Sequence, residues 1–158
     1  MNSPDGAITT FCRLYYRIPF SETDAMKIVH HSNHARYLER GRVEFLRLSG
    51  LDYASIMKRG LHYPLLEIRT RFKKPLVFDE IILIETAILE VSRARLDFQY
   101  KIYSVPALLA PTITTEAYSG VKPSVLGETF HCCVNEMGRP VAAEAGMLKR
   151  LQGLRGKL

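Results

Sequence analysis

Apolar and polar residues alternate from position 11 to position 19. One face of this segment carries Cys12, Leu14, Tyr16 and Ile18, and the other face carries Arg13 and Arg17. A period of two is typical of a half-buried β-strand, so the segment predicts the first strand of the domain. Alternation, or a high content of Ile and Leu, predicts three more strands at 65–73, 81–91 and 95–103. Short turns separate these three strands, and we expect them to form an antiparallel meander.

Helical spacing follows the first strand. Ser32 or Asn33 can cap a helix that runs to about Ser49. The apolar stripe of this helix consists of Ala35, Leu38, Gly41, Phe45 and Leu48. A second, short helix is predicted at 53–59, where Asp52 can serve as its cap.

The second half of the chain predicts mostly strands and one more helix. A last strand at 127–135 leads through a turn to a terminal helix that ends near Leu151. Prolines interrupt the segment 105–124, which is either an insertion or an extended hairpin, and 112–118 is its candidate strand.

The length of 158 residues fits one domain. We predict a single domain at 11–152, with an N-terminal tail at 1–10 and a C-terminal tail at 153–158. An early helix followed by several strands predicts an α+β fold, in which the apolar face of an antiparallel sheet curls around the helix. Such a sheet leaves its edges open, so we expect subunits to pair into a homodimer or homotetramer.

The formal net charge of +6 favours an anionic partner, which can be a nucleic acid, a membrane surface or a phosphate-bearing cofactor. The first residues lack the pattern of a signal peptide, and no run approaches the ~20 apolar residues of a transmembrane helix. We therefore expect a cytoplasmic protein. Cys12, Cys132 and Cys133 lack CxxC spacing and are expected to be small apolar side chains on strands.

Acid–base side chains concentrate between the first strand and the first helix. They are Asp24, His30, His31, His34 and Glu39. A carboxylate on a loop that faces a helix N-terminus can act as a nucleophile or general base, while the free backbone N–H groups of that terminus polarise a carbonyl. This combination suits acyl transfer.

The segment Glu22-Thr23-Asp24-Ala25, followed by Val29-His30-His31, resembles the signature of the 4-hydroxybenzoyl-CoA thioesterase-like hotdog enzymes. Within that family the resemblance is to the branch of bacterial acyl-CoA thioesterases associated with the Tol-Pal system, and it extends over 13–151. It implies a hotdog fold, a curved antiparallel sheet wrapped around one long central helix. It also implies that dimers or tetramers hydrolyse acyl-CoA or acyl-carrier-protein thioesters without a metal or a resident cofactor.

The resemblance assigns roles to individual residues. The family's catalytic aspartate matches Asp24, which would attack the thioester carbon or activate a water molecule. The backbone N–H that polarises the carbonyl falls on His31, whose imidazole can also assist. The turn that contacts the nucleotide of coenzyme A matches Ser92 and Arg93.

Three features depart from the family pattern. Phe20 stands where a tyrosine often precedes the aspartate, and with His30 it is a candidate for substrate binding. Met26 and Lys27 occupy positions where the family usually has one or two glycines, so the loop conformation or the acyl pocket can differ. The segment 105–124 is longer than the usual hairpin, and it can cover the site, extend the sheet or form a mobile loop.

Several of these residues have a second interpretation. Asp24 could cap a turn through neighbouring amides. His30 and His34 could ligate zinc together with Asp24 or Glu39, but no HExxH motif or cysteine partner supports this, so we predict no metal site. We expect His34 to be partly exposed at the helix start, and Glu39 to bond loop amides or to pair with an arginine.

Two other functions compete with hydrolysis. A hotdog protein could bind acyl thioesters or a protein partner without hydrolysing the thioester. Two departures from the family pattern motivate this alternative: the pair Met26-Lys27 and the long segment 105–124. The basic residues on the predicted strands and adjoining turns, Lys73 and Lys74 among them, could bind nucleic acid, but they lack interleaved aromatic side chains and a recognition motif, so no nucleic-acid partner is expected. At the rim of the sheet, the same side chains could instead bind the phosphates of coenzyme A.

Overall fold

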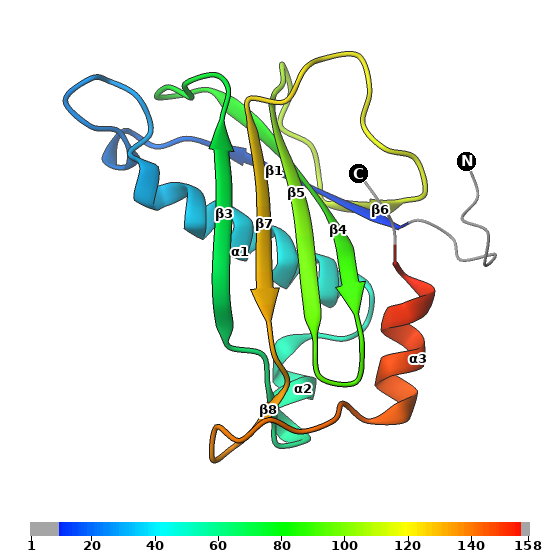
Figure 1. Ribbon diagram of the computed structural model, residues 1–158. Helices are drawn as coiled ribbons and strands as arrows, with labels where there is room; N and C mark the ends of the chain where they lie inside the picture. Colours follow the sequence, from blue (N-terminus) through cyan, green and yellow to red (C-terminus); the bar gives the residue numbers. More distant parts are fainter. Residues whose placement is uncertain (1–9, 156–158) are drawn as a thin grey trace.

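The computed structural model describes residues 10–155, in which a six-stranded antiparallel sheet packs against a long helix (Figure 1). The strands are β1 (Phe11–Arg17), β2 (Leu61–His62), β3 (Leu65–Phe72), β4 (Ile81–Val91), β5 (Leu96–Ser104), β6 (Thr112–Thr114), β7 (Val125–His131) and β8 (Val134–Asn135). The helices are α1 (His31–Leu48), α2 (Tyr53–Lys58) and α3 (Ala145–Gly153), and a short 3₁₀ turn covers Phe20–Glu22.

The strand order across the large sheet is β3-β7-β5-β4-β1-β6, and β2 pairs with β8 in a separate two-stranded sheet. In Figure 1 the large sheet curves around α1, which confirms the predicted α+β hotdog fold. The predicted tails at 1–10 and 153–158 lie largely outside the described residues, and the domain limits stay predictions. Within 10–155, no helix is both long and apolar enough to cross a membrane.

The core lies between α1 and the inner face of the sheet. Phe45 of α1 is fully buried, and its ring centroid lies 6.0 Å from that of Phe98 on β5, at an interplanar angle of 74°. Full burial of a large apolar side chain contributes about 1.5–3 kcal/mol. Helix and sheet lie in close contact at Gly41, where an added Cβ atom would lie 2.4 Å from Oγ1 of Thr86 on β4. Any larger residue at position 41 would therefore push the helix from the sheet.

The predicted apolar stripe of α1 is correct at Leu38, Gly41 and Phe45, which are buried. It is wrong at Ala35, which is exposed, although its neighbour His34 is buried. The buried face includes several residues that the stripe left out: His34, Tyr37, Arg42 and Leu46.

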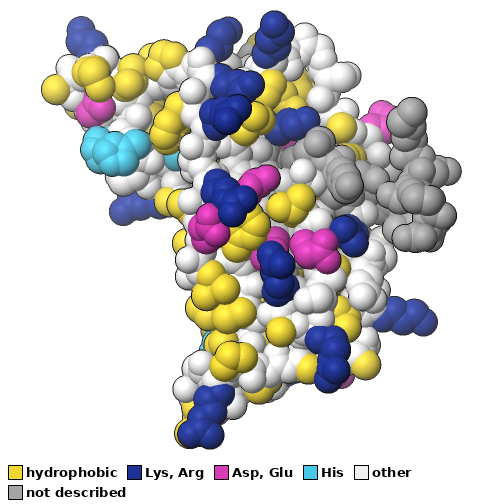
Figure 2. All heavy atoms as spheres, viewed as in Figure 1, with side chains coloured by type: hydrophobic (Ala, Val, Ile, Leu, Met, Phe, Trp, Pro, Cys, Tyr) yellow, Lys and Arg dark blue, Asp and Glu magenta, His cyan; other side chains and the backbone are white. Residues whose placement is uncertain are grey.

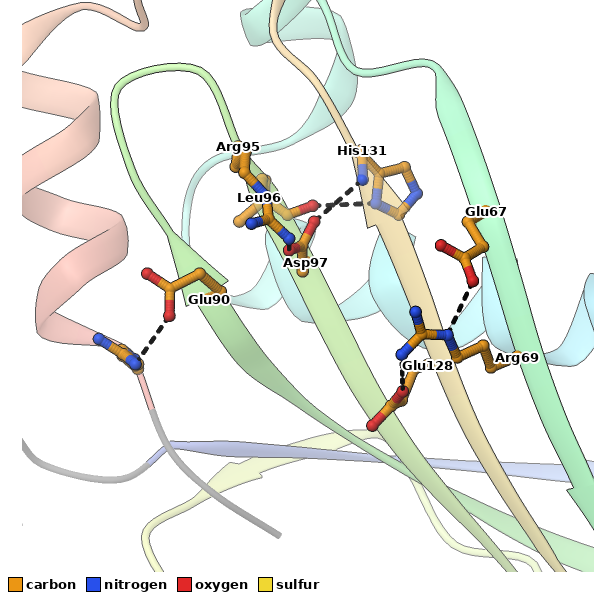
Figure 3. Close-up of polar contacts among 9 residues, drawn as sticks. Glu67, Arg69, Glu90, Arg95, Leu96, Asp97, Glu128 and His131 are labelled. Carbon is orange, nitrogen blue, oxygen red and sulfur yellow. Dashed lines mark hydrogen bonds and ion pairs between the residues drawn. The ribbon is translucent and has the colours of Figure 1, made fainter.

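The predicted meander is correct for β4 and β5, which pair along their length, but wrong for β3. β3 pairs with β7 at the far side of β5. An ion pair on the outer face links the two strands: Arg69 of β3 lies 3.6 Å from Glu128 of β7, and it also pairs with Glu67 on its own strand at 2.7 Å (Figure 3). The guanidinium of Arg69 also lies 4.6 Å from the ring centroid of Phe130 on β7. Cross-strand contacts of this kind are invisible to alternation within a single strand.

The predicted last strand, 127–135, is divided into β7 and β8, because the chain leaves the large sheet and pairs with β2. Cys132 and Cys133 occupy the break, so their predicted strand positions are wrong, whereas Cys12 lies in β1 as predicted. All three thiols are free, and burial raises the pKa of the Cys12 thiol to about 12.

The segment 105–124 extends the sheet, because its strand β6 pairs with β1 at the edge opposite β3. The following loop passes over the outer face of the sheet. There, the backbone N–H of Tyr118 donates to Oε1 of Glu85 at 2.6 Å, and Arg13 lies 3.7 Å from the same oxygen. Burial beneath this loop raises the pKa of Glu85. Of the three roles expected for this segment, which were covering the site, extending the sheet and forming a mobile loop, the structure shows extension of the sheet.

Candidate active site

The loop between the 3₁₀ turn and α1 is closed by hydrogen bonds around Asp24. The backbone N–H of Asp24 donates to the carbonyl of Ile28 at 2.9 Å, and the N–H of Lys27 donates to the carbonyl of Asp24 at 2.9 Å. Oδ1 of Asp24 accepts from the N–H of Met26 at 2.8 Å. One carboxylate oxygen of Asp24 therefore caps the turn through a neighbouring amide, which was the alternative interpretation of this residue. Within residues 10–155, no hydrogen bond involves Oδ2.

Lys27 has a φ of +62°, in the left-handed region that glycine occupies at least cost. Lys27 therefore has the backbone conformation of a glycine, although it stands where the family usually has one. The residue adopts this conformation because hydrogen bonds on both sides of it define the turn.

α1 begins directly after this loop, at His31, and its cap is His30 rather than Ser32 or Asn33. The prediction of the cap was wrong because a histidine ring nitrogen takes the role of the usual oxygen. Nδ1 of His30 lies 3.4 Å from the backbone nitrogen of Ser32, which donates to it. The side chain of Asn33 instead donates to the carbonyl of Glu22 at 2.9 Å.

Asp24 and His31 line the same pocket, which has a volume of about 340 Å³. Its walls come from the loop, the first turns of α1 and the segment that follows β3: Asp24, Met26, Ile28, Val29, His31, His34, Phe72, Lys73, Lys74, Pro75 and Leu76. Figure 2 shows histidine side chains gathered at the end of the molecule that carries this loop. The pocket is apolar on most sides, with carboxylate, imidazole and ammonium groups around it.

His34 is buried in the wall of this pocket, so the expectation of partial exposure was wrong. Its ring centroid lies 4.7 Å from that of Phe72, which arrives from the end of β3 and covers it. Burial lowers the pKa of His34, and its Nδ1 lies 3.3 Å from the carbonyl of His31. Because a carbonyl only accepts, this contact calls for a proton on Nδ1.

Comparison with known proteins agrees with this arrangement. A family model described as "Thioesterase-like superfamily" matches residues 18–151. The chain belongs to the thioesterase-like superfamily.

Individual relatives support this membership of the thioesterase-like superfamily. A protein of Aquifex aeolicus named "Putative esterase" is 39% identical over 98 residues, which cover 62% of this chain and 77% of the relative. The "Acyl-CoA thioester hydrolase" of Escherichia coli is 26% identical over 94 residues, which cover 60% of this chain and 70% of the relative. The crystal structure of a hypothetical protein from Thermus thermophilus superimposes with a TM-score of 0.75 at 29% identity, covering 90% of this chain and 98% of the other.

The thioesterase-like chain brings only two of the predicted site residues, Asp24 and His31, into the pocket wall. Phe20 lies outside the wall, 74% exposed, with its ring edge-on to that of Phe78. The ring of His30 caps α1 and stacks on His31, with centroids 4.1 Å apart.

Ser92 and Arg93 lie in the turn between β4 and β5, at the end of β4 away from the pocket. β4 begins at Ile81, which pairs with Arg17 near the loop. At ~3.4 Å per residue, the strand puts about 30 Å between its two ends. A nucleotide held by both regions would therefore need the turn of another subunit, and the predicted role of Ser92 and Arg93 stays a prediction.

Sequence reasoning missed Phe72, at the end of β3, and Leu76, just after it, which line the pocket although nothing in their local pattern relates them to Asp24. Lys73 and Lys74, which the sequence offered as contacts for the phosphates of coenzyme A, line the same pocket. The backbone N–H groups of Lys73 and Lys74 both donate to the carbonyl of Ser124, at 2.8 and 3.1 Å.

A second hollow, of about 450 Å³, lies on the outer face of the sheet, over β3, β5 and β7. Arg71, Lys101 and Glu128 are among its lining residues, and Figure 2 shows acidic and basic side chains mixed on this face. The smaller pocket remains the candidate active site, because it combines a carboxylate with a helix N-terminus.

The zinc interpretation finds no support in the geometry. Within residues 10–155, no three His, Cys, Asp or Glu side chains are grouped closely enough to hold a metal ion. Glu39 points elsewhere and pairs with Arg42 one helical turn away, at 3.6 Å. This is the arginine pairing that the sequence suggested for Glu39.

Proposed function

We propose that this chain hydrolyses acyl-CoA thioesters to a carboxylic acid and free coenzyme A. The observation that carries the proposal is the pocket shared by the Asp24 carboxylate and the N-terminus of α1. A carboxylate supplies a nucleophile or a base, and a helix N-terminus supplies N–H groups for a developing oxyanion. Membership of the thioesterase-like superfamily and the acyl-CoA activity named for the Escherichia coli relative support the choice of thioester.

In the proposed reaction the thioester carbonyl oxygen accepts a hydrogen bond from the backbone N–H of His31. Within residues 10–155, this N–H has no backbone acceptor, as expected for the first residue of a helix. The helix dipole adds partial positive charge at the same place. The imidazole of His31, also in the pocket wall, is proposed to donate a second hydrogen bond.

Oδ2 of Asp24 attacks the carbonyl carbon or removes a proton from a water molecule that attacks it. The tetrahedral intermediate then expels the thiolate of coenzyme A, which takes up a proton. In the nucleophilic route, water hydrolyses the resulting anhydride and returns Asp24 to its starting state. Both routes consume one water molecule and yield one acid and one thiol.

The phosphates of coenzyme A are proposed to lie near Lys73 and Lys74, at the pocket wall. Ser92 and Arg93 of a second subunit would complete the nucleotide contact. An acyl-carrier-protein thioester, whose arm carries a single phosphodiester, is the alternative substrate.

The free edge of β3 supports a homodimer or homotetramer. Within the described residues, β3 pairs only with β7, and the apolar side chains of Leu66, Ile68 and Phe72 on it are exposed. An exposed apolar edge strand favours pairing with another copy. Because Phe72 also lines the pocket, such pairing would bring the second copy next to the active site. Sedimentation equilibrium should give the mass of a dimer or tetramer, and a monomeric mass at micromolar concentration would contradict this assembly.

The catalytic assignment is tested by release of free thiol from a panel of short, long and aromatic acyl-CoAs. Wild type should hydrolyse at least one of them, and Asp24→Asn should lose about 100-fold or more in kcat/KM, since the amide is neither a nucleophile nor a base at neutral pH. Asp52→Asn is the matched control. Asp52 also bonds a backbone N–H, at the start of α2, and asparagine caps helices equally well.

Two results would overturn the assignment. Wild type could fail on every thioester, or Asp24→Asn could be as active as the control. Binding of coenzyme A without hydrolysis would instead favour the alternative, a hotdog protein that binds acyl thioesters or a protein partner. The Tol-Pal-associated branch and the cytoplasmic location stay predictions that rest on the sequence.

A further inference from the structure

Glu22, two residues before Asp24, has a buried carboxylate that joins the first strand to the helix. Its Oε1 accepts a hydrogen bond from the hydroxyl of Tyr16 on β1, at 2.8 Å. Its Oε2 accepts one from the hydroxyl of Tyr37 on α1, at 2.5 Å. Each oxygen therefore holds a different element, and the 3₁₀ turn that carries Glu22 is fixed between them.

The backbone carbonyl of Glu22 closes the base of the active-site loop. It accepts from the backbone N–H of His30 at 2.9 Å and from the side-chain amide of Asn33 at 2.9 Å. Thr23 and Val29 form a bridge directly above this point. The loop from 23 to 30 is consequently tied at both ends to one residue, which also contacts β1 and α1.

The charge of Glu22 keeps both tyrosines in the donor role. Burial, together with the hydrogen bond to Glu22, raises the pKa of Tyr37 and also that of Tyr16. Both hydroxyls therefore stay protonated across the neutral range and point at the carboxylate. The guanidinium of Arg40 lies 4.5 Å from the ring centroid of Tyr16.

We propose that Glu22 is the positioning residue of the active site: its two tyrosine bonds hold Asp24 at the distance from the N-terminus of α1 that thioester attack requires. This inference rests on the proposed role of Asp24. Glu22 does not line the pocket, so it acts through the loop and not through contact with substrate.

The proposal is distinguished from a purely stabilising role by the kinetic parameter that changes. A misplacement of about 1 Å between reacting groups can cost about 100-fold in rate. Loss of the tyrosine bonds should thus lower kcat, while KM stays within a factor of about two because the pocket walls remain. Loss of stability alone would reduce the amount of folded enzyme and leave the kcat of the folded fraction unchanged.

The experiment compares Glu22→Leu, Glu22→Gln and wild type in the thiol-release assay, with folded enzyme quantified for each. Leucine removes both acceptors, so kcat should fall by about 10- to 100-fold. Glutamine retains two hydrogen-bonding positions, because its amide accepts from one tyrosine and donates to the hydroxyl of the other. Glu22→Gln should therefore recover most of the lost kcat.

Ile88→Ala serves as the stability control, because Ile88 is fully buried on β4, towards the end of the sheet away from the loop. It should lower the melting temperature without lowering the kcat of folded enzyme. If Glu22→Leu does not fold, the single variants Tyr16→Phe and Tyr37→Phe each remove one of the two bonds and leave the other donor on the carboxylate.

The proposal fails if removal of the bonds leaves kcat unchanged, if kcat falls no more than in Ile88→Ala, or if only KM rises. These outcomes differ from failure of the proposed function, which is read from wild type and Asp24→Asn alone. An active wild type and an inactive Asp24→Asn, together with an unaffected Glu22→Leu, would leave the function standing and remove the role of Glu22.

Discussion

Replacing His131 should remove much of the acid sensitivity of the fold. His131 ends β7 and is buried, and its Nδ1 lies 2.9 Å from the carbonyl of Leu96 (Figure 3). A carbonyl only accepts, so Nδ1 carries the proton and Nε2 is left as an acceptor. Within residues 10–155, Nε2 has no hydrogen-bond partner. The site is therefore built for a neutral imidazole.

Burial is the main reason that the pKa of His131 is lowered to about 4, and the nearby guanidinium of Arg42 lowers it further. In the unfolded chain the imidazole has a pKa of about 6.5. Below that value the unfolded chain binds more protons than the folded one, so stability falls as the pH drops from about 6.5 towards 4. The difference of about 2.5 pKa units corresponds to a total decrease of about 3 kcal/mol in the free energy of unfolding. About 2 kcal/mol of this decrease falls between about pH 7 and pH 5.

Urea unfolding of wild type and His131→Asn at about pH 7 and about pH 5 measures this effect. Asparagine keeps a donor near the position of Nδ1 but does not titrate. The loss of unfolding free energy on acidification should therefore be smaller in the variant by about 2 kcal/mol. Other titrating groups are common to both proteins and cancel in the comparison, provided that both are studied at one protein concentration. Equal losses in the two proteins would refute the reasoning.

Two glycine substitutions should differ in cost, although each adds one methyl group. Gly41→Ala puts a Cβ atom 2.4 Å from Oγ1 of Thr86 and 2.9 Å from Cγ2 of Ile84, and both of these side chains are β-branched, so we expect a loss of about 1–3 kcal/mol in thermal unfolding. Gly127→Ala puts a Cβ atom 2.9 Å from both Cδ atoms of Leu38, and the end of this longer side chain can shift more easily than a β-branched one, so its loss should be smaller. An equal or reversed order of melting temperatures would contradict this account.

The sequence located the proposed catalytic residues better than the pocket around them. Asp24 and His31 are close in the chain and share a recognisable motif, and both line the pocket. Phe72 belongs to the same pocket but is distant in the chain, and its contact with His34 explains why that residue is buried. Patterns along the chain describe which face of an element is apolar, but not which element covers it.

The same reason explains the other errors in the fold. Alternation identified β3, but its pairing with β7 depends on contacts such as that between Arg69 and Glu128. The cap of α1 was placed at Ser32 or Asn33 by residue preference, whereas the bond from Asn33 to Glu22 turns that side chain towards the preceding loop. Helix and strand bounds needed only local information, and they were predicted most accurately.

The left-handed backbone at Lys27 has a consequence for recognising distant relatives of this chain. A non-glycine residue in this region costs about 1–2 kcal/mol, yet the turn around Asp24 is still formed. The shape of the loop is therefore encoded by its hydrogen bonds and tolerates a side chain where glycine is usual. A sequence pattern that demands glycine at this position would reject chains that build the same loop. A pattern that weighs the aspartate, the following histidines and the glutamate at the base of the loop would retain them.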